Sequence, residues 1–165
     1  MDPYARGIAR GRPPCRKADV QARLVVVLDT RREARGLELI APYTRAVKRY
    51  DVHEFILTDE AAGPGGTVRR VCGLGFAEVS RGGVLMVGDE VLGPGALRIG
   101  TVAGFDLSHD PNHLNVVIHV DRPLTGMELG LCPGDLLVFR EPEPLPEGGR
   151  GAPGPGVDAS SLPGR

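Results

Sequence analysis

Runs of apolar and β-branched residues alternate with glycine-containing turns along the middle of the chain. The stretch from Val84 to Val120 shows this best and reads VLMVGDEVLGPGALRIGTVAGFDLSHDPNHLNVVIHV. β-Branched residues favour strands, whereas glycine, asparagine and aspartate favour the turns between them. The pattern predicts strands on either side of a polar loop from Ser108 to Asn115. We expect any functional site to lie beside this polar loop.

The same pattern predicts about seven or eight short strands over the central part of the chain. The clearest is residues 22–28, whose consecutive valines suit a strand buried on both faces. The other expected strands are residues 51–58, 67–79, 84–87, 97–102, 114–120 and 135–139. Short strands at this density, separated by glycine turns, predict a mainly β fold, a small and mostly antiparallel β-barrel.

One segment follows a helical period instead. Leu37, Ile40, Thr44 and Val47 recur at spacings of three, four and three residues. Pro42 interrupts this pattern, but proline is tolerated in the first turn of a helix. We therefore expect one short helix over residues 42–50, flanking the barrel.

Glycine and proline are concentrated at the two ends of the 165-residue chain, which has 24 glycines and 15 prolines. Their combined share is about twice the average for globular proteins. The first segment is also rich in arginine, and neither end shows apolar periodicity. We expect a disordered basic arm over residues 1–21, a single barrel domain over 22–140 and a disordered Pro/Gly-rich tail over 141–165.

Charge and composition argue against several classes of partner. The net charge is −1, aromatic residues make up 4% and tryptophan is absent, so nucleic acid is not expected. No apolar run approaches the roughly 20 residues of a membrane span, and the basic N-terminus lacks the apolar core of a signal peptide. Three cysteines without a CxxC pair do not predict a disulfide framework. We expect a cytoplasmic protein that does not bind membranes.

The polar loop and the residue before it carry the side chains best suited to recognise a ligand. The expected ligand-binding residues are Asp106, His109, Asn112, His113 and Asn115. Asparagine amides are also typical of hydrogen bonds that tie a loop to neighbouring strand ends. Both roles stay open at this point.

His109 and His113 also suggest a metal site. Pro111 lies between them and no glutamate follows His109, so the helical HExxH zinc motif is absent. In a loop, however, the two imidazoles can converge on one divalent metal ion, which usually needs a third protein ligand. The candidates for that ligand are Asp106, Asp110 and His53. The residues at 110–112, Asp-Pro-Asn, are equally an ordinary turn sequence.

Four strings together are similar to a small bacterial family of unknown function. They are LVVVLDTRREARGLELI, AVKRYDVHEFILTDE, VGDEV and AGFDLSHDPNHLNVVI, and the resemblance covers about residues 22–139. It implies a bacterial, cytoplasmic protein in which this region is one domain. It implies no activity, cofactor or catalytic residue.

Two functions are therefore expected as alternatives. The first is a non-enzymatic module for small-ligand binding or assembly that uses the polar loop, with a second copy of the chain in a homo-oligomer as its expected partner. The second is a metal-dependent enzyme of the hydrolase or lyase type, in which His109 and His113 hold a divalent metal whose bound water is the nucleophile. Serine-hydrolase and nucleotide-binding motifs are absent from the sequence.

Overall fold

The computed structural model describes residues 16–143, and these residues form twelve strands and one short 3-10 helix. The strands are β1 (Val20–Val27), β2 (Arg31–Arg32), β3 (Leu37–Glu38), β4 (Thr44–Val47), β5 (Val52–Thr58), β6 (Thr67–Val68), β7 (Val71–Arg81), β8 (Gly83–Met86), β9 (Glu90–Leu92), β10 (Arg98–Asp106), β11 (Asn115–His119) and β12 (Leu136–Arg140). The 3-10 helix η1 spans Pro94–Ala96.

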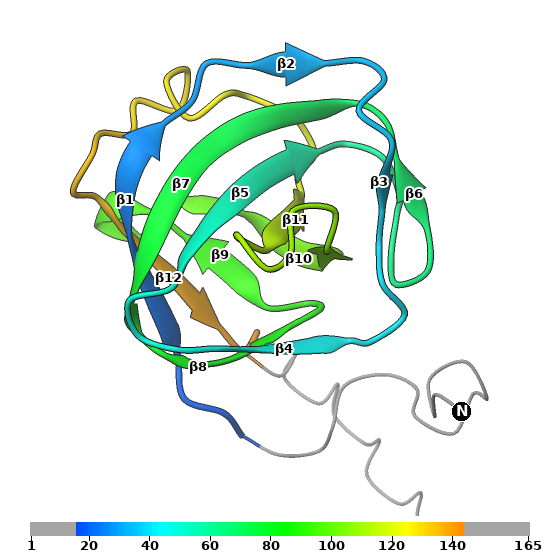
Figure 1. Ribbon diagram of the computed structural model, residues 1–165. Coiled ribbons are helices and arrows are strands. Elements are labelled where there is room, and N and C mark those ends of the chain that lie inside the picture. The colour runs from blue at the N-terminus through cyan, green and yellow to red at the C-terminus, as the bar shows by residue number, and fades with distance from the viewer. Residues whose placement is uncertain (1–15, 144–165) are drawn as a thin grey trace, which may run out of the picture.

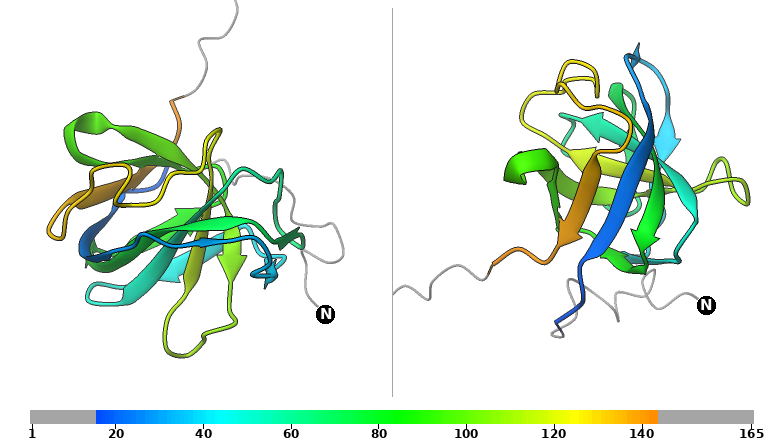
Figure 2. Two further views of the ribbon diagram at one scale, coloured as in Figure 1. Left: turned by 90° about the horizontal axis from the view of Figure 1, so that it is seen from above. Right: turned by 90° about the vertical axis from the view of Figure 1, so that its left-hand side faces the viewer.

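Seven strands close into a barrel, which confirms the predicted mainly β fold. Their order is β1, β12, β9, β10, β11, β5 and β7, and β7 pairs back with β1 to complete the ring (Figure 1). Figure 2 shows the neighbouring strands β1 and β12 side by side. Every pair in the ring is antiparallel except β5 and β11, which run parallel. This parallel pair brings together two strands that are far apart in the sequence.

Alternation along the strands fills the barrel with apolar side chains. Phe55 and Leu57 on β5 point into the interior, where they join Phe105 and Phe139 in one large core cluster. The rings of Phe55 and Phe139 stack with centroids 5.2 Å apart. Because successive residues of a strand point to opposite faces, Glu54 lies on the outer face of the wall. The barrel interior is therefore a packed apolar core, and the polar side chain of Glu54 lies on its outside.

A second, smaller core covers part of the outer wall. Ile56 on β5 and Val117 on β11 pack outward against Leu37 of β3 and Val68 of β6. The strands β3 and β6 form a small separate sheet, which lies outside the barrel (Figure 1). It covers Ile56 but leaves room beside Glu54, one outward position earlier on β5. That room becomes the pocket described below.

The predicted helix over residues 42–50 is wrong. Residues Thr44–Val47 form β4, which pairs with β8 in a separate antiparallel sheet, and the described residues contain no α-helix. Val47 is buried in the main core, and Tyr50 follows with a positive φ of 77°. Pairing with β8 satisfies the backbone and buries Val47 at once, so the tertiary context overrides a weak local helical pattern.

The start of the barrel reaches into the segment predicted as a basic arm. Val20 and Gln21 belong to β1, and Lys17 forms an ion pair of 2.8 Å with the buried carboxylate of Asp89. The remainder of the predicted arm and tail, residues 1–15 and 144–165, lies outside the described residues. Cys72 and Cys132 are free thiols. No helix within residues 16–143 has the length and apolar character needed to cross a bilayer.

Candidate functional site

The polar loop extends from the end of the β10–β11 hairpin, away from the barrel wall (Figure 2). At its base Asp106 and Asn115 are paired residues on β10 and β11. Asn115 is also the register partner of Glu54 in the parallel pair of β11 and β5. Paired residues point to the same face of a sheet. The strand pairing thus places an aspartate, an asparagine and a glutamate side by side beneath the loop.

Asp106 anchors the loop through several hydrogen bonds. Its carboxylate accepts bonds from the Asn115 amide at 2.8 Å, from the backbone N–H groups of Ser108 and Glu38 at 3.1 Å each, and from the Ser108 hydroxyl. Burial alone would raise the pKa of Asp106, but these donors outweigh it and the pKa lies below its usual value. The carboxylate is therefore ionised and fully engaged in holding the loop.

The two loop histidines lie against each other. The rings of His109 and His113 have centroids 4.7 Å apart, and the ring of Phe76 meets His113 edge-on at 5.3 Å. Nδ1 of His109 lies 3.3 Å from the amide nitrogen of Asn115, and Nδ1 of His113 lies 3.4 Å from the amide oxygen of Asn112. In both rings the amide contact is made through Nδ1. Nε2 of His113 is buried and has no hydrogen-bond partner among the described residues.

Glu54 completes the group from the barrel wall. Arg35 donates to both carboxylate oxygens of Glu54, at 2.9 and 2.8 Å, and Nε2 of His113 lies 3.6 Å from Oε2. Burial would raise the pKa of Glu54, but the hydrogen bonds and positive charge of Arg35, with smaller effects of the two histidines, lower it overall. One potential ligand atom each from Glu54, His109 and His113 all lie within 4.8 Å of one another.

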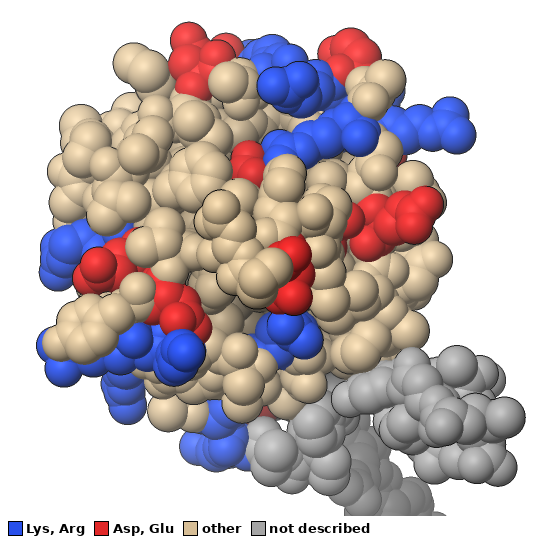
Figure 3. All heavy atoms as spheres, viewed as in Figure 1, with Lys and Arg blue, Asp and Glu red and all other residues tan. Residues whose placement is uncertain are grey.

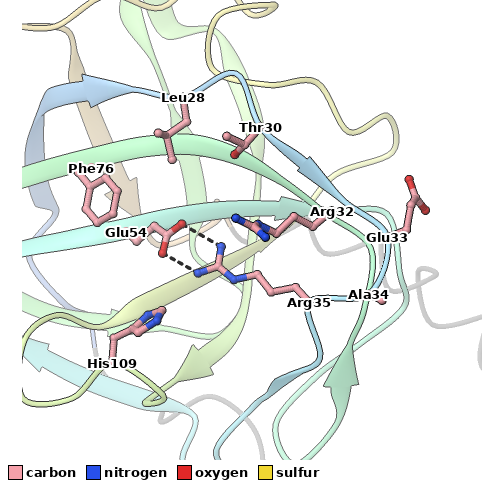
Figure 4. Close-up of a pocket in the computed structure, with 9 residues that line it drawn as sticks. All are labelled: Leu28, Thr30, Arg32, Glu33, Ala34, Arg35, Glu54, Phe76 and His109. Carbon is pink, nitrogen blue, oxygen red and sulfur yellow. Dashed lines mark hydrogen bonds and ion pairs between the residues drawn. The ribbon is translucent and has the colours of Figure 1, made fainter.

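An open pocket of about 800 Å³ adjoins this group. Figure 4 shows Glu54, Phe76 and His109 on one side of it, with the side chains of Arg32 and Arg35 extending toward Glu54 from the other. The pocket lies on the outer face of the wall because its floor residue, Glu54, points outward. Its size is within the range of small-molecule sites.

The structure separates the predicted metal ligands into two sets. His109 and His113 belong to the group, whereas His53 and Asp110 do not. His53 points to the inner face with Phe55, and its Nδ1 accepts the backbone N–H of Leu114 at 3.2 Å. Burial lowers the pKa of His53. Asp110 is exposed in the loop.

The predicted ligand-binding residues also divide. Asp106 and Asn115 lie at the base of the loop and hold it in place, and Asn112 is exposed and contacts His113 alone among the candidate residues. Of the five residues, His109 lines the pocket. His113 belongs to the group with Glu54, and Asp106, Asn112 and Asn115 support the two histidines.

Glu54 and Arg35 are site residues that the sequence pattern did not predict. The predicted residue was His53, the neighbour of Glu54, although strand alternation places these two residues on opposite faces. The deciding fact is that β11 lies beside β5, which puts the outer face of β5 next to the loop. No local sequence pattern reports that pairing. Arg35 follows the short edge strand β2 and reaches Glu54 only through the tertiary fold.

Charged side chains of both signs lie on one face of the described residues (Figure 3). On the face drawn in Figure 3, basic and acidic side chains of the described residues lie intermixed among neutral ones. That nucleic acid is not a partner stays a prediction from the composition.

Together, the fold and the site define a closed β-barrel protein with a polar pocket on its outer wall. Comparison with known protein families identifies the family of the chain. Residues 14–140 match a family described as "Family of unknown function (DUF6917)", and the chain belongs to that family. This confirms the predicted resemblance to a family of unknown function. Neither the curated proteins nor the solved structures contain a match.

Proposed function

We propose that the protein binds a small ligand through a divalent transition-metal ion held by Glu54, His109 and His113. The observation that carries the proposal is their convergence: one ligand atom from each residue lies within 4.8 Å of the others, and Nε2 of His113 faces Glu54 without a hydrogen-bond partner among the described residues. A buried polar atom without a partner is unfavourable and calls for an explanation. A metal ion would satisfy it.

The donor set suits such an ion. Two imidazoles and one carboxylate are ligands of catalytic zinc and of non-haem iron, and both sites keep positions open for water or substrate. Ligand atoms about 2 Å from a tetrahedral ion lie about 3.3 Å apart. The separation of 3.6 Å between His113 and Glu54 is already close to this spacing. His109 is exposed on the polar loop, so its ring can turn inward to complete the set.

Neighbouring groups would orient all three ligands. The contact of His113 Nδ1 with the amide oxygen of Asn112 favours the tautomer that leaves Nε2 for the ion. Nδ1 of His109 lies against the amide group of Asn115, with the nitrogen at 3.3 Å and the oxygen at 3.5 Å, and this contact holds the ring beside the group. Arg35 holds the Glu54 carboxylate, and each oxygen of that carboxylate still has a second lone pair for coordination. This arrangement of supporting hydrogen bonds is typical of metal centres.

Binding is favoured over catalysis by the state of the nearby carboxylates. Asp106 and Glu54 are both engaged in hydrogen bonds, and in Figure 4 the carboxylate of Glu33 points away from Glu54 and His109. The described pocket residues thus offer no free carboxylate aimed at a metal-bound water. A metal-dependent hydrolase or lyase is the second candidate, because two of the three ligands line the open pocket.

Metal titration of the purified protein tests the proposal. After chelation and dialysis, the full-length protein is expected to take up about one equivalent of Zn²⁺ and, with Co²⁺, to show the visible absorption of a low-coordinate site. Zn²⁺ should raise the midpoint of thermal unfolding, because an ion that binds only the folded state stabilises it. The variants His109→Ala, His113→Ala and Glu54→Gln are each expected to lose stoichiometric uptake.

His119→Ala is the matched control, because His119 lies at the end of β11 and is not part of the group of Glu54, His109 and His113. It should bind Zn²⁺ like the wild type. Wild-type protein that takes up no Zn²⁺ or Co²⁺, or a control variant that loses the ion as completely as the three ligand variants, would overturn the proposal. A metal-loaded protein that hydrolyses or cleaves a bound ligand would favour the second candidate.

A further inference from the structure

We infer that the ligand of this pocket is a small carboxylate with an apolar body. The inference deepens the proposed function, on which it rests for one of its two positive groups, the metal ion. The other positive group is Arg32. Both would face the same pocket of about 800 Å³.

Arg32 contributes a positive charge to the pocket. It lines the pocket, and its side chain makes no hydrogen bond or ion pair with any residue in the range 16–143. The neighbouring Arg31 and Arg35, by contrast, are paired with Glu128 and Glu54. In Figure 4 the guanidinium of Arg32 extends over the pocket toward Glu54. An arginine placed in this way is ready to form a bidentate pair with a ligand carboxylate.

The balance of charge in the pocket also favours an anion. Arg35 and Glu54 neutralise each other, and Glu33 directs its carboxylate away from the site (Figure 4). The uncompensated groups are therefore Arg32 and the proposed ion on His109 and its partners. A carboxylate can bridge such a pair, with its oxygens shared between guanidinium and metal.

Part of the remaining wall is apolar. Leu28 and Phe76 line the pocket on the side of β1 and β7, and the aromatic face of Phe76 is held by its edge-on contact with His113. Apolar lining with a few placed polar groups is typical of sites for small organic ligands. A phosphate would instead be expected on several backbone N–H groups or a helix N-terminus. Within residues 16–143 the pocket has no helix beside it.

Benzoate and its uncharged isostere benzamide test the inference. Isothermal titration of the full-length, Zn²⁺-loaded protein should show binding of benzoate and at least tenfold weaker binding of benzamide, because the charge-assisted pair with Arg32 is lost. In Arg32→Gln the dissociation constant for benzoate should rise about tenfold, with that for benzamide unchanged. The dissociation constant of Arg32→Lys for benzoate should lie between those of the wild type and Arg32→Gln, because lysine keeps the positive charge but lacks the planar guanidinium.

Arg49→Gln is the control for a general effect of charge. Arg49 is exposed, stacks over Tyr50 and does not line the pocket, so its loss removes one positive charge elsewhere. It should leave benzoate binding unchanged. Equal affinities for benzoate and benzamide, or equal losses in Arg32→Gln and Arg49→Gln, would overturn the inference.

The same titration on metal-free protein separates this inference from the proposed function. Weaker benzoate binding that still depends on Arg32 would support the carboxylate pocket even where Zn²⁺ uptake fails. A protein that takes up Zn²⁺ with all three predicted ligands but binds benzoate in neither form would contradict the inference and leave the metal centre standing.

Discussion

Side-chain hydrogen bonds hold the polar loop in place, and Asp106 accepts several of them. Asp106 is 3% exposed, and its carboxylate accepts hydrogen bonds from the loop, from Asn115 and from the outer strand β3. Asn115 in turn contacts His109. A substitution of Asp106 is therefore expected to disturb the loop, the candidate site and the outer sheet together.

Asp106 should make folding sensitive to acid. Its pKa is lower in the folded protein than in the unfolded chain, so its ionised form stabilises the fold at neutral pH. This contribution is present above about pH 4, the ordinary pKa of aspartate, and is lost as the pH falls through the lower folded value. Asp106→Asn should be less stable at pH 7 and should lose part of the acid dependence seen in the wild type.

Urea denaturation at pH 7, 4 and 3 measures this difference. Asp110→Asn serves as the control, because Asp110 is exposed and its side chain makes no hydrogen bond with the described residues. Its stability should follow the wild-type curve. Parallel curves for wild type and Asp106→Asn below pH 4 would show that this carboxylate does not drive the acid dependence.

At the scale of the element, close approach between β1 and β7 shapes the wall next to the pocket. The register between β7 and β5 shifts next to Gly75, and the register between β7 and β1 shifts nearby, between Leu24 and Val26. A Cβ atom at Gly75 would lie 2.3 Å from the backbone oxygen of Val26. Only glycine allows the two strands to pair here, which explains the glycines that the sequence scatters through a strand-like run.

Gly75→Ala should therefore destabilise the protein by about 1–3 kcal/mol, the usual effect of forcing extra volume into a packed region. Gly63→Ala is the matched control, since a Cβ there meets nothing within 4 Å and the backbone is not left-handed. Its unfolding free energy should be unchanged or slightly higher. Equal denaturation midpoints for the two variants would contradict this account of the strand pairing.

At the scale of the whole molecule, the last strand closes the ring. β12 lies between β1 and β9, so the barrel is complete only when the end of the described chain has joined its beginning. Phe139 is fully buried and stacks on Phe55 of β5 across the interior. Closure and core packing thus depend on the same strand.

Phe139→Ala should lower the unfolding free energy by about 3–5 kcal/mol, the range for a large aromatic removed from a core. Since small domains are stable by about 5–15 kcal/mol, much of the fold's stability would be lost. Met127→Ala provides the comparison, because Met127 is 61% exposed and outside the core. Urea denaturation followed by circular dichroism compares the two, and a similar small effect in both would mean that β12 adds little to closure.

Local pattern and distant pairing explain which predictions succeeded. The strands at residues 51–58 and 114–120 were predicted well because apolar and β-branched residues mark them within a few positions. The helix was wrong because its apolar spacing is equally compatible with β4 once β8 lies beside it. His109 and His113 were found as residue types, whereas Glu54 was not, because its role depends on a strand from another part of the chain.

The sequence by itself determined a glycine-punctuated, mainly β domain, with two histidines and their supporting amides in one polar loop. These features follow from backbone preferences and hydrophobic alternation, which act over a few residues. Only the tertiary structure decided that β11 pairs in parallel with β5, that Glu54 and Arg35 meet the histidines, and that the pocket lies outside the barrel. Strand order depends on how the whole sheet buries its apolar face and closes, and no single segment of the sequence determines either.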